Sequence, residues 1–503
     1  MSLKTNQNSP GYLLAIDLGS SACKASVLSL DGEMISLSRA VTPLVDHDPD
    51  EMEETPERWW QAAVGAIQEA ILKAAVPPTK IVGIGVCAFM HTPIGLDAHG
   101  AVVTPTIIWY DTRSTPQAEA LRQEFGSQFR EITGDEPRHN HTAAKIRWLV
   151  DNYPERVAQV RHWLLPKDYL RYRLTGLIST DVSDAMGTLL YDPVQQRWDE
   201  ALVKAAGTEI VFLPDIYETL KQESHLSKAG ADATGLVEGT PVVGCADGYA
   251  TLIGANGCSD GQTCLYLGTS AWITRFVFDI NADPRHKIVP LEDGYHQWLG
   301  AIASAGATLS WIAKIFGAED IATLLASAET IQPGAEGLLF LPHLAGERGP
   351  VHDPYAKGAL VGLSLAHNRP EILRAVLEGV AFQITSVLQA SELQDEIEIL
   401  TIVGGGATSC LWVQIIADII NKNLEVPVIV EAGLLGTAAL TGTAIGLLRN
   451  PQVNAAGMYR RAYVQEPDSD RARRYLEVFR KYEETDTLFN KGLFKSWREE
   501  NIK

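Results

Sequence analysis

The 503-residue sequence predicts an α/β protein made of two related halves, and three observations support this. First, a turn of small residues occurs twice, as Leu-Gly-Ser-Ser-Ala at 18–22 and as Leu-Gly-Thr-Ser-Ala at 267–271, half a chain apart. Second, each copy lies between two apolar stretches typical of strands. Third, stretches with helical spacing follow these strands. Length alone allows about three domains, but a duplicated plan favours two large ones.

The first half opens with three predicted strands, over residues 12–17, 23–30 and 34–40. The Gly-Ser-Ser turn joins the first strand to the second. Asp31-Gly32, a strong hairpin signal, joins the second strand to the third.

A helix is expected after these strands, because apolar residues recur with helical spacing over 59–71. It ends before Pro77-Pro78 and should cover one face of the sheet. A buried strand over 81–86 follows. Residues 87–91 then emerge at the sheet edge, a common place for ligand groups.

Residues 83–88, Gly-Ile-Gly-Val-Cys-Ala, also fit the GxGxxA pattern of dinucleotide-binding turns. Such a turn should follow a strand and open a helix, whereas these glycines lie inside the strand and Pro93 comes soon after. We interpret the two glycines as sites of close packing against the sheet.

The rest of the chain continues in the same manner. The sequence predicts mostly helix over 118–152, a helix over 166–174 and a loop-rich tract that reaches a domain boundary near residue 245. The second half then repeats the plan, with strands over 264–267 and 272–278, helices over 306–315 and 321–328, a strand over 400–403 and a helix over 411–420.

The two repeated turns are candidate phosphate sites. Gly19, Ser20 and Ser21 offer backbone N–H groups and hydroxyls without bulky side chains, and so do Gly268 and Thr269. Small turn residues also recur by chance, and this is the preferred interpretation for one copy alone. The duplication favours two turns that together hold the phosphates of a nucleotide.

The residue before each turn differs between the halves. Asp17 precedes the first turn, and Tyr266 precedes the second. Because carboxylate oxygens suit Mg²⁺, only the first half is equipped to hold that ion.

A third glycine-rich turn follows the predicted strand over 400–403. Gly404, Gly405, Gly406 and Ala407 lie between this strand and a helix, which leaves bare backbone on which a nucleoside can rest, beside the helix dipole. A tight turn required only by packing explains the segment equally well when it is considered alone. The two phosphate turns favour the nucleoside site.

Composition excludes several classes of function. A formal net charge of -20 argues against a nucleic-acid surface. The six cysteines form no CxxC pair, so we expect small buried residues in a reducing compartment. The polar N-terminus is unlike a signal peptide and no apolar run is long enough to cross a bilayer, so we expect a cytoplasmic protein without a membrane partner.

At this point the chain resembles the FGGY carbohydrate kinases, members of the actin-like and hexokinase-like ATPase superfamily. Residues 358–363 (Gly-Ala-Leu-Val-Gly-Leu), followed by Glu-Ile at 371–372 and Ala-Val-Leu-Glu at 375–378, are similar to the C-terminal signature of that family. Further blocks occur in the expected order at 16–21, 145–149, 180–185, 267–270 and 346–348.

The resemblance implies two ribonuclease-H-like α/β domains around a central cleft, a sugar-binding domain over 10–245 and an ATP-binding domain over 246–490. It implies ATP and Mg²⁺ as cofactors, with the three turns described above binding ATP. Asp247 aligns with the catalytic aspartate of the family, which takes a proton from the sugar hydroxyl. Asp17 and Asp247 are the expected metal and catalytic residues. Alternatively or in addition, Asp247 caps the helical run over 249–253.

The resemblance also suggests sugar contacts by Met90, His91, Trp109 and Asp111, together with Asp247. Without it, a satisfied core histidine, a packed tryptophan and a solvated aspartate are the preferred interpretations. Overall, the run over 94–113 is most similar to xylulokinases.

Three positions depart from the family patterns. Xylulokinases usually have Gly and Asn where this chain has Thr92 and Tyr110, and gluconokinases usually have Ser at the first position. Cys410 stands where some relatives carry Asn near the adenine. We expect D-xylulose as the substrate, with gluconate or another polyol as the alternative.

Two other classes of function share this superfamily. An actin-like nucleotide switch would not need a polyol site, and a sugar-sensing regulator would need a DNA-binding head before the strand that begins near Tyr12. The oligomeric state is left open, with a homodimer as one candidate.

Overall fold

The computed structural model describes residues 11–42, 53–221, 224–255, 261–278, 295–349, 352–391, 394–494 and 496. It divides into two compact units. Unit 1 contains Met1–Cys258, Phe278–Gln297 and Ala432–Tyr459, and unit 2 contains Ser259–Val277, Trp298–Glu431 and Arg460–Lys503. Segments from both sides of residue 245 therefore contribute to unit 1.

Unit 1 is built on a six-stranded mixed sheet with the order β13-β14-β5-β1-β2-β3. Its strands are β1 (Tyr12–Leu18), β2 (Ala22–Ser29), β3 (Met34–Val41), β5 (Ile81–Ala88), β13 (Ser224–His225) and β14 (Pro241–Ala246). The strands β1, β2 and β3 form an antiparallel meander, while β5 and β14 run parallel to β1. The strands predicted for the first half are confirmed.

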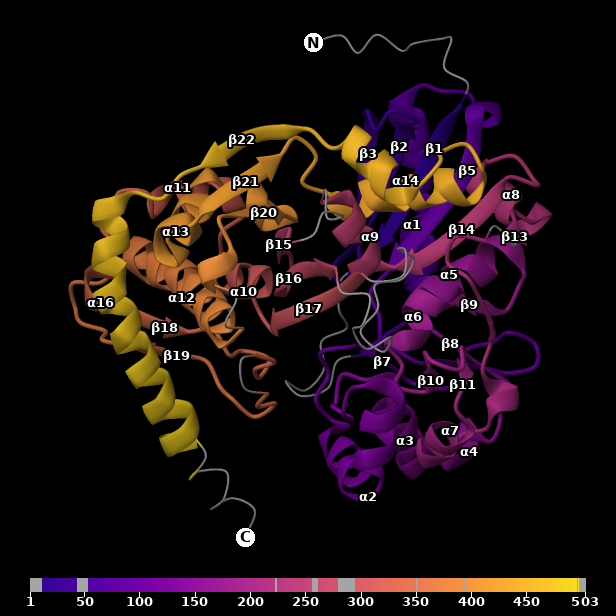
Figure 1. Ribbon diagram of the computed structural model, residues 1–503, viewed down its shortest axis with the longest axis horizontal. Helices are drawn as coiled ribbons and strands as arrows, with labels where there is room; N and C mark the ends of the chain where they lie inside the picture. Colours follow the sequence, from indigo (N-terminus) through magenta and orange to yellow (C-terminus); the bar gives the residue numbers. More distant parts are fainter. Residues whose placement is uncertain are drawn as a thin grey trace. The chain divides into compact units, whose positions relative to one another are not determined.

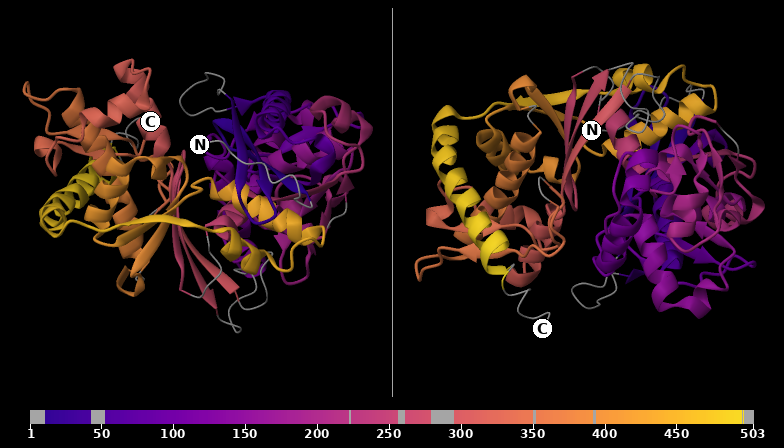
Figure 2. Two further views of the ribbon diagram at one scale, coloured as in Figure 1. Left: turned by 90° about the horizontal axis from the view of Figure 1, so that it is seen from above. Right: turned by 60° about the horizontal axis from the view of Figure 1, so that its bottom comes forward.

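Two helices cover opposite faces of this sheet. Helix α1 (Pro56–Ala74) buries Trp59 and Ile67 in one cluster with Leu14 and Ile16 of β1. Helix α14 (Ala432–Ala444) packs on the other face, and Figures 1 and 2 show its ribbon, near the yellow end of the colour scale, among the indigo strands.

The glycines of β5 explain how α14 comes so close. A side chain on Gly85 would start 2.2 Å from Thr441 Oγ1, and one on Gly83 would start 2.7 Å from Ile445 Cδ1. These glycines are packing sites, as predicted, and not part of a dinucleotide-binding turn.

The other elements of unit 1 surround this sheet. Its helices are α2 (Thr115–Thr133), α3 (Thr142–Asn152), α4 (Pro154–Val157), α5 (Pro166–Thr175), α6 (Val182–Met186), α7 (Glu200–Ala205), α8 (Lys228–Thr234), α9 (Asp247–Gly254) and α15 (Pro451–Met458). Its short strands are β4 (Glu53–Glu54), β6 (Ile94–Leu96), β7 (Thr106–Ile107), β8 (His162–Leu164), β9 (Ser179–Asp181), β10 (Tyr191–Asp192), β11 (Arg197–Trp198) and β12 (Asp215–Tyr217).

Unit 2 repeats the plan with a second six-stranded sheet, ordered β17-β16-β15-β20-β21-β22. Its strands are β15 (Thr263–Leu267), β16 (Ala271–Phe278), β17 (Tyr295–Ile302), β20 (Ile399–Val403), β21 (Asn423–Pro427) and β22 (Arg461–Gln465), and β18 (Leu339–Leu341) pairs separately with β19 (Ala359–Val361). In both sheets the first strand of the opening meander lies beside a parallel strand from later in the sequence. The predicted α/β class and the repeated plan are confirmed.

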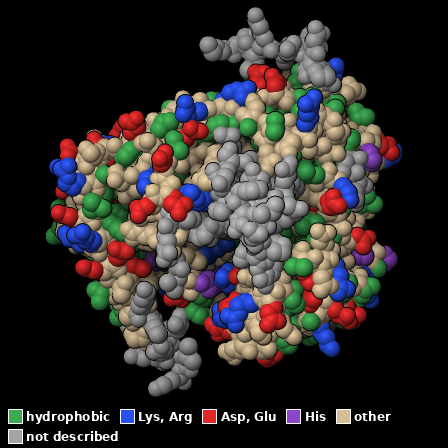
Figure 3. All heavy atoms as spheres, viewed as in Figure 1, with side chains coloured by type: hydrophobic (Ala, Val, Ile, Leu, Met, Phe, Trp, Pro, Cys, Tyr) green, Lys and Arg blue, Asp and Glu red, His purple; other side chains and the backbone are tan. Residues whose placement is uncertain are grey.

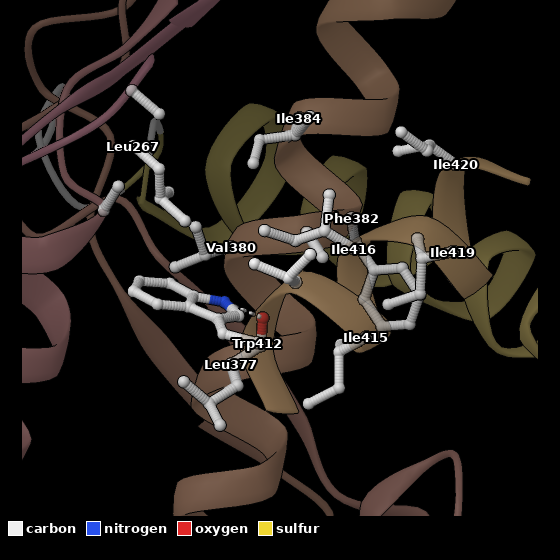
Figure 4. Close-up of a cluster of buried hydrophobic side chains, with 14 of the residues drawn as sticks. Leu267, Leu377, Val380, Phe382, Ile384, Trp412, Ile415, Ile416, Ile419 and Ile420 are labelled. Atoms are coloured by element: carbon white, nitrogen blue, oxygen red, sulfur yellow. Dashed lines mark hydrogen bonds between the residues drawn. The ribbon is translucent and has the colours of Figure 1, made fainter. Parts of the chain in front are cut away.

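Among the described residues, unit 2 contains the helices α10 (Gly306–Phe316), α11 (Ile321–Ser327), α12 (Arg369–Ala390), α13 (Cys410–Ile420) and α16 (Ser469–Asp486). The core of the unit joins α12 and α13, where Trp412 lies among Leu377, Val380 and Leu267 (Figure 4). The indole Nε1 of Trp412 donates a hydrogen bond to the Leu377 carbonyl at 3.2 Å, so this large side chain is buried without an unsatisfied donor.

Surface and cysteine predictions have mixed outcomes. Cys23, Cys87, Cys245 and Cys264 are buried as expected, but Cys410 is exposed, because it begins α13 at the end of a loop. Cys258 lies outside the described residues. Acidic and basic side chains are interspersed on the face drawn in Figure 3. None of the described helices combines the length and apolar character that crossing a membrane requires.

Candidate functional site

In unit 1, the candidate site residues lie at the carboxyl ends of three parallel strands. Asp17 of β1 is in register with Cys87 of β5, and Cys87 is in register with Cys245 of β14, two residues before Asp247. Asp17 and Cys245 are therefore two strand spacings apart, roughly 10 Å, and Asp247 lies just beyond the carboxyl end of the strand that carries Cys245. Both are partly exposed, which leaves them accessible to a ligand.

Two helices begin beside these carboxylates. Asp247 is the first residue of α9, and its Oδ1 accepts a hydrogen bond from the N–H of Gly248 at 2.7 Å. The residue before the helix is Ala246, so Asp247 is not the N-cap that the alternative interpretation expected. The first turn of α14 reaches Asp17, because a side chain on Gly433 would start 3.4 Å from Asp17 Oδ2. Positive helix ends at this edge favour anions.

A pair of glycines brings the two helices together. A side chain on Gly436 of α14 would start 1.8 Å from the Ala250 carbonyl, and one on Gly254 of α9 would start 1.9 Å from the Ala432 carbonyl. The backbones of α9 and α14 thus touch directly. This contact fixes the two helix ends that lie beside Asp17 and Asp247.

A buried polar network holds the backbone that carries Asp247. Ala246 donates its N–H to Ser183 Oγ at 2.9 Å, and the Ser183 hydroxyl donates to Asp181 Oδ2 at 2.5 Å. Lys167 Nζ donates to Asp181 Oδ1 at 2.5 Å and lies 3.6 Å from Asp184 Oδ2. All the charged members of this network are buried.

Burial and charge act differently on the two aspartates of this network. Burial opposes ionisation of Asp181, yet Lys167 and the Ser183 hydroxyl hold its pKa below the usual value. Burial raises the pKa of Asp184 well above its usual range, and the nearby carboxylates, Asp247 among them, raise it further. The neutral form of Asp184 is therefore favoured, which limits the negative charge beneath Asp247.

Trp109, one of the proposed sugar contacts, is hydrogen-bonded to the first phosphate turn. Trp109 Nε1 donates a hydrogen bond to Ser20 Oγ at 3.3 Å. The Trp109 ring meets the ring of Tyr110 edge to face, with 4.8 Å between their centroids. Gly19 and Ser20 are partly exposed and Ser21 is exposed, so this turn is open to a ligand.

Met90 and His91 lie against a second segment. The His91 Nδ1 is 2.8 Å from the Gly187 carbonyl. Because a carbonyl only accepts, Nδ1 carries the hydrogen and Nε2 is the acceptor in the neutral ring. A side chain on Gly187 would start 2.3 Å from Met90 Cε, and Met186 contacts the hydroxyl of Tyr249 in α9. These contacts connect His91 to the helix that begins at Asp247.

Asp111 is bound to a cation within the protein. It is 1% exposed, and both its carboxylate oxygens accept from Arg113 Nε, at 3.0 and 2.9 Å. Arg113 also donates to Glu53 Oε1 at 2.6 Å. The solvated aspartate of the alternative interpretation is thus wrong, and the carboxylate of Asp111 orients Arg113.

Unit 2 brings its two glycine-containing turns together. Thr269 and Gly268 follow β15, the triglycine turn follows β20, and these strands are parallel neighbours. Gly404 has a φ of +91°, and a side chain there would start 2.7 Å from the Leu267 carbonyl. Glycine is therefore required at this position.

The turns of unit 2 expose backbone that a ligand can approach. Gly405 is exposed and its α-carbon faces open space, so a flat ring can approach the backbone. Gly268 and Thr269 are partly exposed. The Gly268 carbonyl accepts from the N–H of Gly306, the first residue of α10, at 2.8 Å, and the Thr269 carbonyl accepts from the N–H of Ala305, the residue before that helix, at 3.0 Å. Ala407, which follows the three glycines of this turn, is buried, with 2% of its surface exposed.

The described residues contain no group of three or more His, Cys, Asp or Glu side chains arranged to hold a metal ion. Mg²⁺ in phosphoryl-transfer sites needs only one or two carboxylates, because phosphate and water supply the other ligands. Asp17 and Asp247 satisfy this smaller requirement.

Sequence reasoning missed the part of the site made by α14. The signal was present as Gly433 and Gly436, small residues three positions apart at the start of an apolar helix. It also missed Lys167, which shows no pattern by itself, although its partner Asp181 lies in one of the motifs that were identified.

Comparison with known proteins agrees with this geometry. Residues 12–254 match the N-terminal domain of the FGGY family of carbohydrate kinases, and residues 291–445 match its C-terminal domain. A xylulose kinase from Bacillus subtilis is 31% identical over 94% of this chain and 96% of its own length. A gluconokinase from the same organism is 28% identical over 92% and 93%.

Solved structures show the same architecture. The ligand-bound xylulose kinase from Lactobacillus acidophilus superimposes with a TM-score of 0.80 at 26% identity, covering 95% of this chain and 98% of that one. Matches of this extent favour a kinase over an actin-like switch or a regulator. The chain belongs to the FGGY family of carbohydrate kinases and is an ATP-dependent phosphotransferase acting on a sugar.

Proposed function

We propose that this kinase transfers the γ-phosphoryl group of ATP to D-xylulose and forms D-xylulose 5-phosphate. The similarity to xylulose kinases over nearly the whole chain supports this substrate. Gluconokinases are also similar, so gluconate is the alternative substrate. The charges around the proposed sugar contacts argue against gluconate.

The choice of D-xylulose over gluconate rests on Arg113 and Lys145, two cationic side chains near the proposed sugar contacts that are already bound to other groups of the protein. Arg113 is bound to Asp111 and Glu53, and its side chain is 6% exposed. Lys145 is fully buried and donates to backbone carbonyls. The carboxylate of gluconate would therefore compete with Asp111, Glu53 and backbone carbonyls for these two cations. An uncharged ketose does not need a cation as its partner.

In the proposed reaction, Asp247 accepts the proton of the sugar hydroxyl as that oxygen attacks the γ-phosphorus. His91 Nε2 accepts from a second hydroxyl and Trp109 covers an apolar side of the sugar. Asp17 and Asp247 would hold Mg²⁺, which would supply positive charge to offset that of the phosphates.

The three turns are the proposed phosphate and nucleoside contacts. Backbone N–H groups and hydroxyls at Ser20, Ser21 and Thr269 would donate to phosphate oxygens as charge develops. Gly405 and Gly406 would support the nucleoside. We propose that the reaction takes place in the cytoplasm. We also propose that the protein is a homodimer, which light scattering distinguishes from a monomer.

A coupled assay of ADP release tests the substrate. D-xylulose, D-ribulose, L-ribulose, gluconate and glycerol are compared at equal concentration, and we expect the highest kcat/KM for D-xylulose. A higher kcat/KM for gluconate would overturn both the substrate and the charge argument. Equal ADP release with and without every sugar would overturn the proposed reaction.

A further inference from the structure

A buried ammonium group joins the two segments that carry the proposed sugar residues. Lys145 lies in the first turn of α3 and is fully buried. Its Nζ donates to the carbonyl of Ile108 at 2.6 Å and to that of His91 at 3.3 Å. One of these carbonyls belongs to His91, which is itself a proposed sugar contact. The other belongs to the residue before Trp109. These two segments are distant in sequence, and one side chain bridges them.

The backbone of His91 needs such support. Its φ is +70°, in the left-handed region that residues with a side chain rarely adopt. This conformation is unfavourable for a residue with a side chain and persists only where the surroundings hold it. Lys145 donates to the His91 carbonyl, and the His91 Nδ1 donates to the Gly187 carbonyl, so both the backbone and the side chain of His91 are held.

Other residues on the same face of α3 contact the same two segments. His141, Lys145 and Trp148 are spaced four and three residues apart, which aligns them along the helix. The ring of His141 meets that of His91 edge to face, with 5.4 Å between centroids. The Arg113 guanidinium lies over Trp148, 5.1 Å from the ring centroid. This face of α3 is therefore a common support for both sugar-binding segments.

We propose that Lys145 is a positioning residue for sugar binding, which fixes the left-handed backbone of His91 and the spacing between His91 and Trp109. The inference rests on the proposed sugar contacts of these two residues. Lysine suits the task because one ammonium group has three donors and can serve two carbonyls at once. Without it, both carbonyls lose a charged partner and His91 is free to relax to a negative φ.

The variant Lys145→Met tests this role, because methionine keeps much of the side-chain length and removes every donor. We expect the KM for D-xylulose to rise at least tenfold, while the KM for ATP changes less than twofold. Arg147→Met is the matched control, since Arg147 lies on the same helix but is 40% exposed and pairs with Asp151. That control should leave both KM values unchanged.

Thermal unfolding and ATP binding report whether each variant folds. If Lys145→Met does not fold, Lys145→Gln is measured, since its shorter amide cannot serve both carbonyls. An unchanged KM for D-xylulose in a folded variant would overturn the inference. Failure of both variants to fold would also overturn it, because Lys145 would then act on stability alone.

The wild-type enzyme separates this inference from the proposed function. If the wild type phosphorylates D-xylulose and Lys145→Met does so with the same KM, only the inference fails. If the wild type prefers another sugar in the screen, the substrate proposal fails and the KM for that sugar is compared instead. A tenfold rise specific to the sugar would then support Lys145 with the other substrate.

Discussion

The indole of Trp109 donates a hydrogen bond to the hydroxyl of Ser20 at 3.3 Å, which joins a proposed sugar contact directly to a proposed phosphate turn. The two residues come from segments 89 positions apart in the chain. A substitution at either residue should therefore affect the binding of both the sugar and ATP. Double-mutant cycles measure such coupling.

We expect Trp109→Phe and Ser20→Ala each to lower kcat/KM for D-xylulose about fivefold, since a hydrogen bond contributes about 1 kcal/mol. The double variant should be scarcely worse than either single variant. Trp163→Phe is the control, because Trp163 donates a similar bond to Thr208 Oγ1 at 3.0 Å outside the proposed site. Multiplicative losses in the double variant would show that the two residues act independently.

Asp247→Asn should lower kcat by about 10²- to 10⁴-fold, the usual contribution of a general base. Sugar binding, measured by calorimetry, should persist because the amide keeps the shape of the side chain. Asp199→Asn provides the control, since Asp199 caps α7 and its replacement keeps a capping oxygen. Turnover near that of the wild type would exclude Asp247 as the base.

Ser183→Ala should lower both stability and kcat. The substitution leaves the buried N–H of Ala246 without its acceptor, which costs about 1–3 kcal/mol in unfolding free energy. The start of α9, and with it Asp247, should then be held less firmly. Ser227→Ala, which removes a bond to the Gly230 N–H at the start of α8, should reduce stability without changing kcat. Equal kcat in the two variants would contradict a role for Ser183 in holding Asp247.

His343 predicts a pH dependence of stability in unit 2. Burial disfavours the imidazolium, but hydrogen bonds to Asp486 at 2.8 Å and Glu347 at 2.7 Å outweigh it and raise the pKa to about 9. Since the unfolded pKa is about 6.5, the stabilisation is complete below that pH and is lost as the pH rises through 9. Thermal unfolding across this window should show the loss, and His343→Gln should remove it. A slope that persists in His343→Gln would assign the effect to another group.

Gly254→Ala and Gly436→Ala should each destabilise unit 1 strongly, because the new Cβ would meet a backbone carbonyl at 1.9 and 1.8 Å. Gly65→Ala is the control: Gly65 lies within α1 with open space around it, so alanine should stabilise the helix by about 0.5–1 kcal/mol. Chemical denaturation measures both. Equal stability of the two classes of variant would show that α9 and α14 can separate at little cost.

Local signals in the sequence predicted most of the fold. The strand that carries Asp17 was predicted because it is a short apolar run that ends at a turn. The strand before Asp247 was not predicted, because the glycines that precede it led to the interpretation of a loop-rich tract. The glycines at 83 and 85 were interpreted correctly as packing sites because they lie inside a strand. Elements defined by neighbours in the chain thus followed from composition and spacing.

Features that depend on distant partners did not follow from local patterns. The bond from Arg113 to Glu53 was missed because these residues are 60 positions apart in the chain. Gly433 approaches Asp17 although more than 400 residues separate the two in the sequence. Cys410 is exposed although apolar residues follow it, because it begins α13 at the end of a loop.

The return of α14 to the first sheet has a consequence for biosynthesis. The face of β1 and β5 that contains Leu13 and the two β5 glycines is covered by a helix that begins at residue 432. During translation, this face stays bare until the ribosome has made residues 432–444, long after it has made β1 and β5. A fragment ending at Cys258 should therefore aggregate when expressed alone, and co-expression of residues 432–459 should keep it dispersed.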